Sequence, residues 1–341
     1  WTNTGAGLEN SPFFPANIIQ QITFKLQAAY NTFNQTGPLA ALIQLYRPMW
    51  GNRQVGVTNP DVFCQFGKNN PTYGTDLTLN TNIDIPFAFM FDEYFDLTAS
   101  GDPARKVYDA WISPFYMAAQ ARVVVPTITI APQLATGDLL GSPVSRLGTD
   151  TTSTYTDPAM SFQVNRNAWW TASSAAGNPP QYPWLYTRDY FTQPTAGQGQ
   201  VGCLIQNTGV SVGQVLSLYG FVWDPQANGG LGAVVPMSDI DSFELVTGGS
   251  LQNMYVTPQQ LTDKMRSAYG WNDGDDSTVP DGAFVLDFAL SEDGGYISNA
   301  NAINTYLVNG VQLNIKFKSG SVPSSTSTVY LGVEALKLAT S

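Results

Sequence analysis

The chain has 341 residues, of which 43% are hydrophobic and 12% charged, and it contains no histidine. Its 15 basic and 26 acidic side chains give a formal net charge of -11. Without an imidazole there is no Ser-His-Asp relay, no Cys-His nucleophile, no His-ligated zinc or haem and no histidine acid–base catalysis. Any catalysis by this chain would therefore have to use carboxylate, lysine or tyrosine side chains, and the alternative is that the chain is not catalytic.

The charged fraction is about half of the ~25% that is usual for soluble domains, so the polar surface must consist mainly of Asn, Gln, Ser, Thr, Gly and Tyr. Such a surface suits repeated packing, because neighbours can meet without desolvating many ions. The excess of acidic over basic side chains argues against direct binding to the phosphate backbone of nucleic acids, because the affinity for phosphates comes from Lys and Arg side chains that displace counterions. We expect the densest basic spots, Arg105-Lys106 and Lys316 with Lys318, to be solvated surface residues.

Glycine and proline, 31 and 22 residues, punctuate short stretches rich in Val, Ile, Thr, Phe and Tyr along the whole chain. This pattern is typical of an all-β protein. In Val311–Lys318 the apolar residues occupy the odd positions, which predicts a strand with one buried face and one solvent-exposed face. The predicted strands are Ile83–Phe91, Ala121–Ile130, Ser161–Asn165, Leu185–Phe191, Val201–Gln206, Val215–Trp223, Ala283–Leu290, Val311–Phe317 and Thr328–Leu338.

Two segments carry helix signals. Asp102-Pro103 resembles an acidic cap followed by a first-turn proline, and it predicts a helix from Ala104 to about Ala119 that Pro114 ends or kinks. Thr257-Pro258-Gln259-Gln260 is a capping box with proline at its first helical position. Leu261, Met265 and Ala268 then form an apolar stripe that ends near Gly270.

The order of elements suggests two similar halves. The two predicted helix starts lie about 155 residues apart, and each precedes a strong strand, so a duplicated architecture is the economical interpretation, although no sequence identity accompanies it. The polar stretch Thr192–Gln200 is typical of a linker. We therefore predict domains at residues 1–195 and 196–341, with surface excursions at 137–158 and 173–183.

Two motifs resemble ligand sites only formally. Gly197-Gln-Gly199-Gln-Val-Gly202 matches the dinucleotide fingerprint, but a strand is predicted where the helix must start, so we interpret it as a linker. Asp273–Ser277 resembles the start of a calcium loop, but Thr278 and Phe284 replace its required glycine and glutamate. Asp273–Asp276 is therefore expected to be an acidic turn, with a looser cation site as the alternative.

Two clusters of carboxylates could supply the acid and base of a glycosidase, but only if they face each other across a shared cleft. They are Asp92-Glu93 with Asp96, and Asp239 with Asp241 and Glu244. We expect them to cap strands and loops instead. Trp169-Trp170, Trp184 and Trp223 could stack on sugars, but filling cores and subunit contacts is the favoured interpretation. Cys64 and Cys203 lie among apolar neighbours and are expected to be buried thiols.

The longest apolar runs, Ile85–Phe91 and Val123–Ala131, are far shorter than the ~20 residues of a membrane span, so no integral span is expected. Position 1 is Trp and no charged-then-apolar leader follows it. The given chain is therefore expected to be processed or to lack its first residues.

The second half carries a resemblance to a known family in five segments. They are Ser242-Phe-Glu-Leu-Val246, the capped helix of Thr257–Arg266, Val279-Pro-Asp-Gly-Ala-Phe-Val-Leu-Asp287, Asn304–Val311 and Val329-Tyr-Leu-Gly-Val-Glu334. This order resembles the double jelly-roll major capsid proteins of tailless icosahedral viruses, the lineage of tectiviruses and the adenovirus hexon. The membrane-containing bacteriophage branch is the most similar.

Two segments of the first half also look similar to that family in position and in residue pattern, namely Pro15-Ala-Asn-Ile-Ile19 and Phe89–Leu97. Hexon-like tower insertions do not fit in 341 residues, and the basic or helical N-terminal arm of some members is not evident after Trp1.

The resemblance implies an all-β subunit of two eight-stranded jelly-roll barrels side by side, with short helices inserted in loops. It implies a homotrimer that contacts neighbouring capsomers in a virion shell, partnered by minor capsid or vertex proteins, over an internal membrane in the phage branch. No specific nucleic-acid binding, catalytic residue, cofactor or metal site is expected. The alternatives are a secreted carbohydrate-active or carbohydrate-binding β-sandwich and an extracellular fibre or adhesin module.

Overall fold

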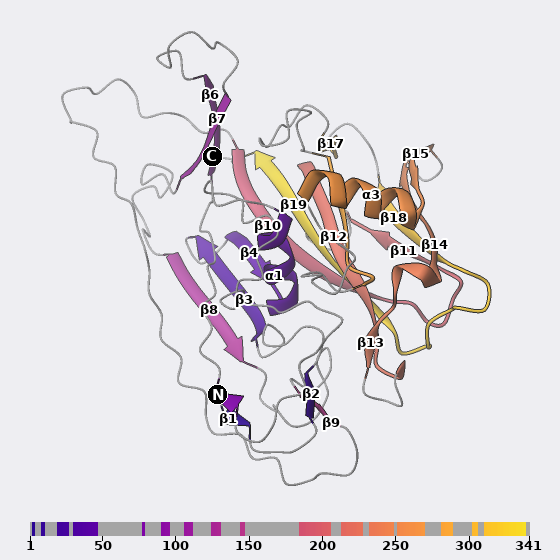
Figure 1. Ribbon diagram of the computed structural model, residues 1–341. Helices are drawn as coiled ribbons and strands as arrows, with labels where there is room; N and C mark the ends of the chain where they lie inside the picture. The colour runs from indigo at the N-terminus through magenta and orange to yellow at the C-terminus, as the bar shows by residue number, and fades with distance from the viewer. Residues whose placement is uncertain are drawn as a thin grey trace, which may run out of the picture.

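The computed structural model is mainly β (Figure 1). It describes residues 2–3, 8–10, 19–26, 30–46, 77–78, 90–95, 106–111, 124–130, 144–146, 184–205, 213–227, 232–248, 251–269, 281–288, 302–305 and 310–338.

One eleven-stranded sheet contains strands from both predicted halves of the chain. Its strands are β3 (Ile19–Leu26), β4 (Tyr30–Gln35), β6 (Met90–Phe95), β7 (Lys106–Trp111), β8 (Val124–Ile130), β10 (Trp184–Pro194), β12 (Gln214–Asp224), β13 (Ala233–Val234), β16 (Phe284–Asp287), β17 (Ile303–Asn304) and β19 (Thr328–Leu338). The main path is β13-β12-β19-β10-β4-β3-β8, while β16 and β17 also pair with β12, and β6 pairs with β10 and β7. The final strand β19 therefore lies between β12 and β10 (Figure 1).

Pairing in this sheet crosses the predicted boundary at residue 195. β10 pairs with β19 along its whole length, from Trp184 opposite Leu338 to Pro194 opposite Thr328. On its other side β10 pairs in parallel with β4, with Arg188 opposite Phe33. The described strand pairs are otherwise antiparallel. The boundary itself stays a prediction, but β10 holds strands of both halves through backbone hydrogen bonds.

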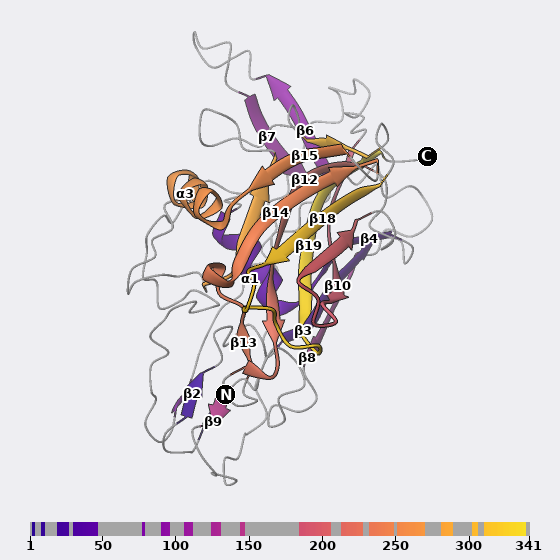
Figure 2. The ribbon, with the colours of Figure 1, turned by 90° about the vertical axis from the view of Figure 1, so that its right-hand side faces the viewer.

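A second, four-stranded antiparallel sheet comes entirely from the second half, in the order β11-β18-β14-β15. These strands are β11 (Gln200–Leu204), β18 (Val311–Phe317), β14 (Ile240–Thr247) and β15 (Leu251–Val256). Two small ladders pair β1 (Thr2–Asn3) with β5 (Leu77–Thr78) and β2 (Leu8–Asn10) with β9 (Val144–Arg146). Figure 2 shows the four-stranded sheet from a direction at 90° to Figure 1.

The main core lies between the two large sheets. The predicted alternation in β18 is confirmed, because Val311, Leu313, Ile315 and Phe317 are all buried and Lys316 is exposed. Across the core, the rings of Phe243 on β14 and Phe284 on β16 lie 4.8 Å apart between centroids. Each such buried side chain contributes roughly 1.5–3 kcal/mol by removal from water, so this layer holds the sandwich together.

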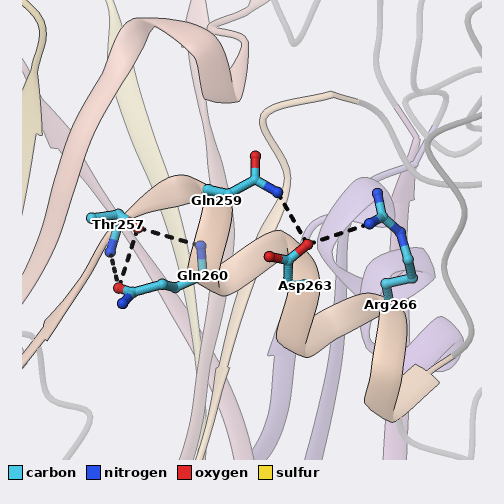
Figure 3. A network of polar contacts seen from close by, with 5 residues as sticks. All are labelled: Thr257, Gln259, Gln260, Asp263 and Arg266. Carbon is cyan, nitrogen blue, oxygen red and sulfur yellow. Dashed lines mark hydrogen bonds and ion pairs between the residues drawn. The ribbon is translucent and has the colours of Figure 1, made fainter.

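Helix α3 (Pro258–Tyr269) begins where the capping box predicts. The Gln260 amide N–H donates to the Thr257 hydroxyl (3.3 Å), and the Thr257 amide donates to the Gln260 side-chain oxygen (3.0 Å), as Figure 3 shows. On the exposed side, the Asp263 carboxylate accepts from Gln259 and pairs with Arg266 (Figure 3). The predicted stripe residues Leu261 and Met265 are buried, and the helix lies against β14 and β16.

A second helix, α1 (Gly37–Tyr46), is not predicted by the sequence analysis. Its start carries a readable signal, since the Thr36 hydroxyl accepts from the Leu39 amide (3.4 Å) just before the first-turn Pro38. The sequence of the helix is apolar at nearly every position, however, and a short apolar run cannot be assigned to helix or strand by periodicity. Leu39, Ala40 and Leu42 are buried, and the helix contacts β3, β12 and β19.

Residues 215–223 of β12 are buried at every position. The four-stranded sheet covers one face of the strand and α1 contacts it on the other side (Figure 1). This explains why Val215–Trp223 is an almost continuous apolar run instead of an alternating one.

The predicted helix at 104–119 is wrong. Residues Lys106–Trp111 form β7, which pairs antiparallel with β6 from Phe95 opposite Lys106 to Met90 opposite Trp111. The segment contains Val107, Tyr108 and Trp111, whose branched and aromatic side chains favour a strand, and cross-strand pairing outweighs the Asp102-Pro103 signal. The duplicated architecture was inferred from the spacing of two predicted helices. Because the first of them is a strand at residues 106–111, that spacing no longer supports a duplication.

Most other predicted strands are confirmed within a few residues. The structure has β8, β10, β11, β12, β16, β18 and β19 at the segments expected from Ala121–Ile130, Leu185–Phe191, Val201–Gln206, Val215–Trp223, Ala283–Leu290, Val311–Phe317 and Thr328–Leu338. The prediction at Ile83–Phe91 overlaps the described residues only at the start of β6. Ser161–Asn165 and both predicted surface excursions lie outside the described residues, apart from 144–146, which form β9.

The predicted linker is more ordered than expected. Thr192–Pro194 belong to β10, and the chain then turns at Ala196 and Gly197, which both have positive φ, 53° and 66°. The Gln198 amide donates to the Thr195 carbonyl (3.1 Å), closing the turn before β11. This turn connects the eleven-stranded sheet to the four-stranded sheet.

Candidate functional site

The face of the eleven-stranded sheet next to α1 carries a buried polar row. Glu334 on β19 lies opposite Arg188 of β10 on one side and Ser217 of β12 on the other. The Ser217 hydroxyl donates to the Glu334 carboxylate (2.8 Å), and Glu334 and Arg188 are 0% and 2% exposed. Because a carboxylate and a guanidinium are buried opposite each other, a shifted register would leave either charge without its counterpart.

A second row lies one step along the same strands. Tyr190, Gly332 and Tyr219 are in register across β10, β19 and β12. A Cβ atom on Gly332 would come within 2.3 Å of the Tyr219 ring, so glycine leaves the space in which this ring lies. The buried Tyr219 hydroxyl donates to the Gln35 side-chain oxygen (2.9 Å) at the end of β4. This bond joins residues 184 positions apart and ties the first half to the second.

The third row is aromatic. Tyr330 on β19 lies opposite Phe221 on β12, and their rings stack with centroids 5.3 Å apart. Burial, and then the Asp189 carboxylate, raise the pKa of Tyr190, while burial and Tyr190 raise the pKa of Tyr330. We call the surface formed by these rows the covered face; it comprises Arg188, Tyr190, Ser217, Tyr219, Phe221, Tyr330, Gly332 and Glu334.

Polar side chains also link the strands of the first half. The Asn34 amide on β4 donates to the Asp189 carboxylate on β10 (2.8 Å), and the Gln21 amide on β3 donates to the Asn34 oxygen (2.8 Å). Together with the covered face, this chain of bonds positions β3 and β4 against β10 by specific partners as well as by backbone pairing.

At the end of β12, the Asp224 carboxylate connects two loops by hydrogen bonds. Its carboxylate accepts from the Ser324 hydroxyl (2.6 Å), the Ser324 amide (3.0 Å) and the Gln226 amide (3.0 Å). Burial alone raises the pKa of Asp224, but these bonds and Ser327 outweigh it and lower the pKa. The Ser324 carbonyl in turn accepts from the Thr195 hydroxyl (3.2 Å), so Asp224 also holds the turn between the sheets.

The second predicted carboxylate cluster does not converge on a cleft among the described residues. Asp239 lies in the short 3-10 helix η4 (Met237–Asp239), and its carbonyl accepts from the Lys318 amide (2.9 Å). Asp241 pairs with Lys316 (3.4 Å) on the outside of the four-stranded sheet, with Glu244 further along β14. The structural role expected for these carboxylates stays a prediction. Asp92 and Glu93 lie on β6, and Asp96 and Asp273–Asp276 fall outside the described residues.

The cysteine and tryptophan predictions are confirmed where the structure describes them. Cys203 is a free thiol at 0% exposure, and burial raises its pKa to about 12, so it stays protonated and unreactive near neutral pH. Trp223 is buried in the core, where Gly232 leaves room for its ring. Trp184 begins β10, while Cys64 and Trp169-Trp170 lie outside the described residues.

The glycine motif is a turn and strand, as expected. Gly197 lies in the turn and Gly202 in β11, so no helix follows to receive a pyrophosphate. Within the described ranges, no group of three or more Cys, Asp or Glu side chains is arranged to hold a metal ion. No helix in the described part of the chain is long and apolar enough to cross a membrane.

Comparison with known proteins relates this geometry to solved structures. No family model matches the chain, and no curated protein is detectably similar in sequence. The crystal structure of the major capsid protein of Sulfolobus turreted icosahedral virus resembles it with a TM-score of 0.53 and 12% identity, covering 99% of this chain and 86% of that one. The PBCV-1 virus capsid has a TM-score of 0.44 and 10% identity over 100% and 88% of the two chains. Major capsid protein P2 from bacteriophage PM2 has a TM-score of 0.37 and 10% identity over 99% and 91%.

The first of these matches shows the fold. The chain has the double jelly-roll fold of that capsid protein, built mostly of antiparallel sheets with few helices. The predicted resemblance is thereby confirmed for the fold, while the narrower likeness to the phage branch stays a prediction. The two matches with TM-scores below 0.5 add no argument.

Proposed function

We propose that this chain is a major capsid protein, a non-enzymatic structural subunit of an icosahedral virus shell. The observation that carries the proposal is the match to a viral major capsid protein across 99% of this chain at a TM-score of 0.53. In the proposed subunit, residues 1–195 and 196–341 each form an eight-stranded jelly roll, and the two barrels stand side by side.

The covered face supports this arrangement. A shell subunit must present both of its barrels in one fixed geometry, because errors in their relative position would accumulate around the shell. The pairing of β10 with β19 and β4, and the bond from Tyr219 to Gln35, hold strands of the two halves in one register. Backbone ladders and buried polar partners both penalise displacement.

Self-association supplies the partners of the proposed subunit. Three copies would place six barrels in a nearly hexagonal tile, and tiles would meet across broad faces. A surface with 12% charged residues suits such contacts, because many modest contacts can secure a shell that still corrects errors during assembly. We further propose that minor capsid or vertex proteins contact the shell, that an internal membrane lies beneath it, and that the protein occurs in the virion.

The proposed subunit uses no catalytic residue, cofactor or metal ion, and it does not bind nucleic acid directly. A net charge of -11 supports the last point, because binding to a phosphate backbone depends on basic side chains. Titration with duplex DNA at increasing salt should show no strong affinity. Tight binding with a steep salt slope would oppose a shell that is separated from the genome.

Native mass spectrometry of the purified chain tests the proposal. We expect a stable trimer of a 36.9 kDa chain, and larger assemblies at higher concentration. A monomer that persists over a wide concentration range would favour the alternatives, a carbohydrate-active sandwich or an adhesin module.

A further inference from the structure

Eight strands within residues 184–338 form a sandwich that encloses its own core. In the eleven-stranded sheet, β10, β19, β12 and β16 are successive hydrogen-bonded neighbours. The four-stranded sheet β11-β18-β14-β15 faces them, and the rings of Phe243 and Phe284 meet between the two layers. We call these eight strands the second-half sandwich. Strand β10 belongs to it by pairing, although it precedes the predicted boundary at residue 195.

The first-half elements beside this sandwich form a group of their own. β3 pairs with β4 on one side and with β8 on the other, and α1 contacts β3 (Figure 1). We call β3, β4, β8 and α1 the docked group. In the described part of the chain, the docked group adds Ile22, Leu39, Ala40 and Leu42 to the buried core cluster, whose other members lie in residues 201–333. Apolar burial, the main source of stability, is thus concentrated in the sandwich.

The backbone connection between the docked group and the sandwich is short. β10 is in antiparallel register with β19 along all 11 of its residues. With β4 it forms a parallel ladder in which Arg188 lies opposite Phe33. Parallel pairing is slightly less stable per residue than antiparallel pairing. Separation between β4 and β10 therefore breaks fewer backbone bonds than separation between β10 and β19.

The side-chain links across this connection are polar. The Tyr219 hydroxyl donates to the Gln35 oxygen, and the Asn34 amide donates to the Asp189 carboxylate. The Gln35 side chain is fully buried, yet its amide nitrogen has no hydrogen-bond partner among the residues that the structure describes. A buried donor without a partner costs free energy that is recovered when water reaches it. Water can replace all of these partners, so the polar links oppose separation less than apolar contacts do.

We infer that the docked group opens as one unit while the second-half sandwich stays folded. Such sub-global opening is drawn from the regions of a protein with the least buried apolar contact. Opening exposes the covered face to water and leaves the core between the two sheets closed. The inference refines the proposed boundary at residue 195, because it assigns β10 to the second unit. It does not depend on the capsid proposal, since it rests on pairing and burial within one chain.

Native-state hydrogen exchange of the full chain, followed by mass spectrometry at low urea concentrations, tests the inference. Peptides from β3, β4 and α1 should exchange together, about tenfold or more faster than peptides from β10, β12, β18 and β19. Their exchange should also depend less on urea, because their opening exposes less surface. A common rate for the two sets, or exchange of β10 together with β3 and β4, would overturn the inference.

Two matched variants test whether the units are separate. Ile22 on β3 and Ile315 on β18 are both fully buried, and Ile→Val removes one methylene-sized group from either. Ile315→Val weakens the sandwich equally whether the docked group is closed or open. It should therefore speed exchange of the sandwich about twofold to tenfold and leave exchange of the docked group unchanged. Ile22→Val weakens only the closed state, so it should speed exchange of both sets by the same factor.

The two variants give opposite results if the chain unfolds as one unit. In that case Ile315→Val would speed exchange of both sets equally, and the inference would be wrong. Failure of the capsid proposal is a separate result. A chain that stays monomeric in native mass spectrometry would contradict that proposal, whereas two distinct sets of exchange rates in the same monomer would still support this inference.

Discussion

The covered face of the eleven-stranded sheet and the outside of the four-stranded sheet use polar residues in opposite ways. On the covered face, Arg188 and Glu334 are almost completely removed from water. On the outside of the four-stranded sheet, the side chains of Lys316 and Asp241 remain 51% and 41% exposed. A buried charge is costly without its partner, whereas an exposed pair loses little when broken. The covered face therefore specifies one arrangement of strands, whereas the exposed pair contributes little to that choice.

The largest expected effect follows from Glu334→Ala. The substitution leaves the buried Ser217 hydroxyl without its acceptor and Arg188 opposite a methyl group, so we expect a loss of about 3–5 kcal/mol in the free energy of unfolding. Urea denaturation monitored by tryptophan fluorescence measures it. The double variant Arg188→Met with Glu334→Leu should recover much of the loss, because no buried charge remains. A loss below about 1 kcal/mol for Glu334→Ala would show that the row does not fix the sheet.

Gly332→Ala should have the next largest effect. The added methyl group would meet the Tyr219 ring at 2.3 Å, and moving this ring disturbs its bond to Gln35. Overpacking of this kind costs about 1–3 kcal/mol. The matched control is Gly199→Ala, since a Cβ atom there has no neighbour within 4 Å and its φ is not positive. Equal stability of the two variants would contradict the close fit of ring and glycine.

Asp224→Asn tests a polar group of intermediate exposure. The pKa of Asp224 is lower in the folded chain than in the unfolded chain, so its carboxylate stabilises the fold above the ordinary Asp pKa. That contribution is lost as the pH falls through the folded-state pKa. The melting temperature of Asp224→Asn should therefore lie below that of the wild type at pH 7 and approach it in acid. A difference that does not change with pH would contradict the role of the carboxylate charge.

The smallest effect should come from Lys316→Ala on the outer side. The ion pair with Asp241 is half-exposed, and such pairs contribute roughly 0.2–1 kcal/mol. The change should shrink further at high salt, which screens exposed charges. A loss as large as that of Glu334→Ala would remove the contrast between the two sides.

Local signals predict the elements of this fold better than their partners. The capping box at Thr257 and the alternation in Val311–Phe317 are confirmed because both depend on neighbouring residues. The helix predicted from Asp102-Pro103 fails because pairing with β6 decides the structure of residues 106–111. Helix α1 is missed because its sequence is apolar at nearly every position, which removes the stripe that identifies a helix.

The covered face could not be predicted from the sequence for a related reason. Arg188, Ser217 and Glu334 come from three strands, and no pattern in one segment specifies which residue of another segment lies opposite. The polar positions within the apolar strands Val215–Trp223 and Val329–Leu336 were the available signal. A buried polar residue in such a run requires a partner, although the run does not say which one.

Electron cryomicroscopy of the assembled protein tests the central claim most directly. The account predicts a trimer in which six β-sandwiches surround the threefold axis, with β10 and β19 paired inside each chain. A structure in which each chain forms a solitary sandwich, or in which the chains do not associate, would contradict it.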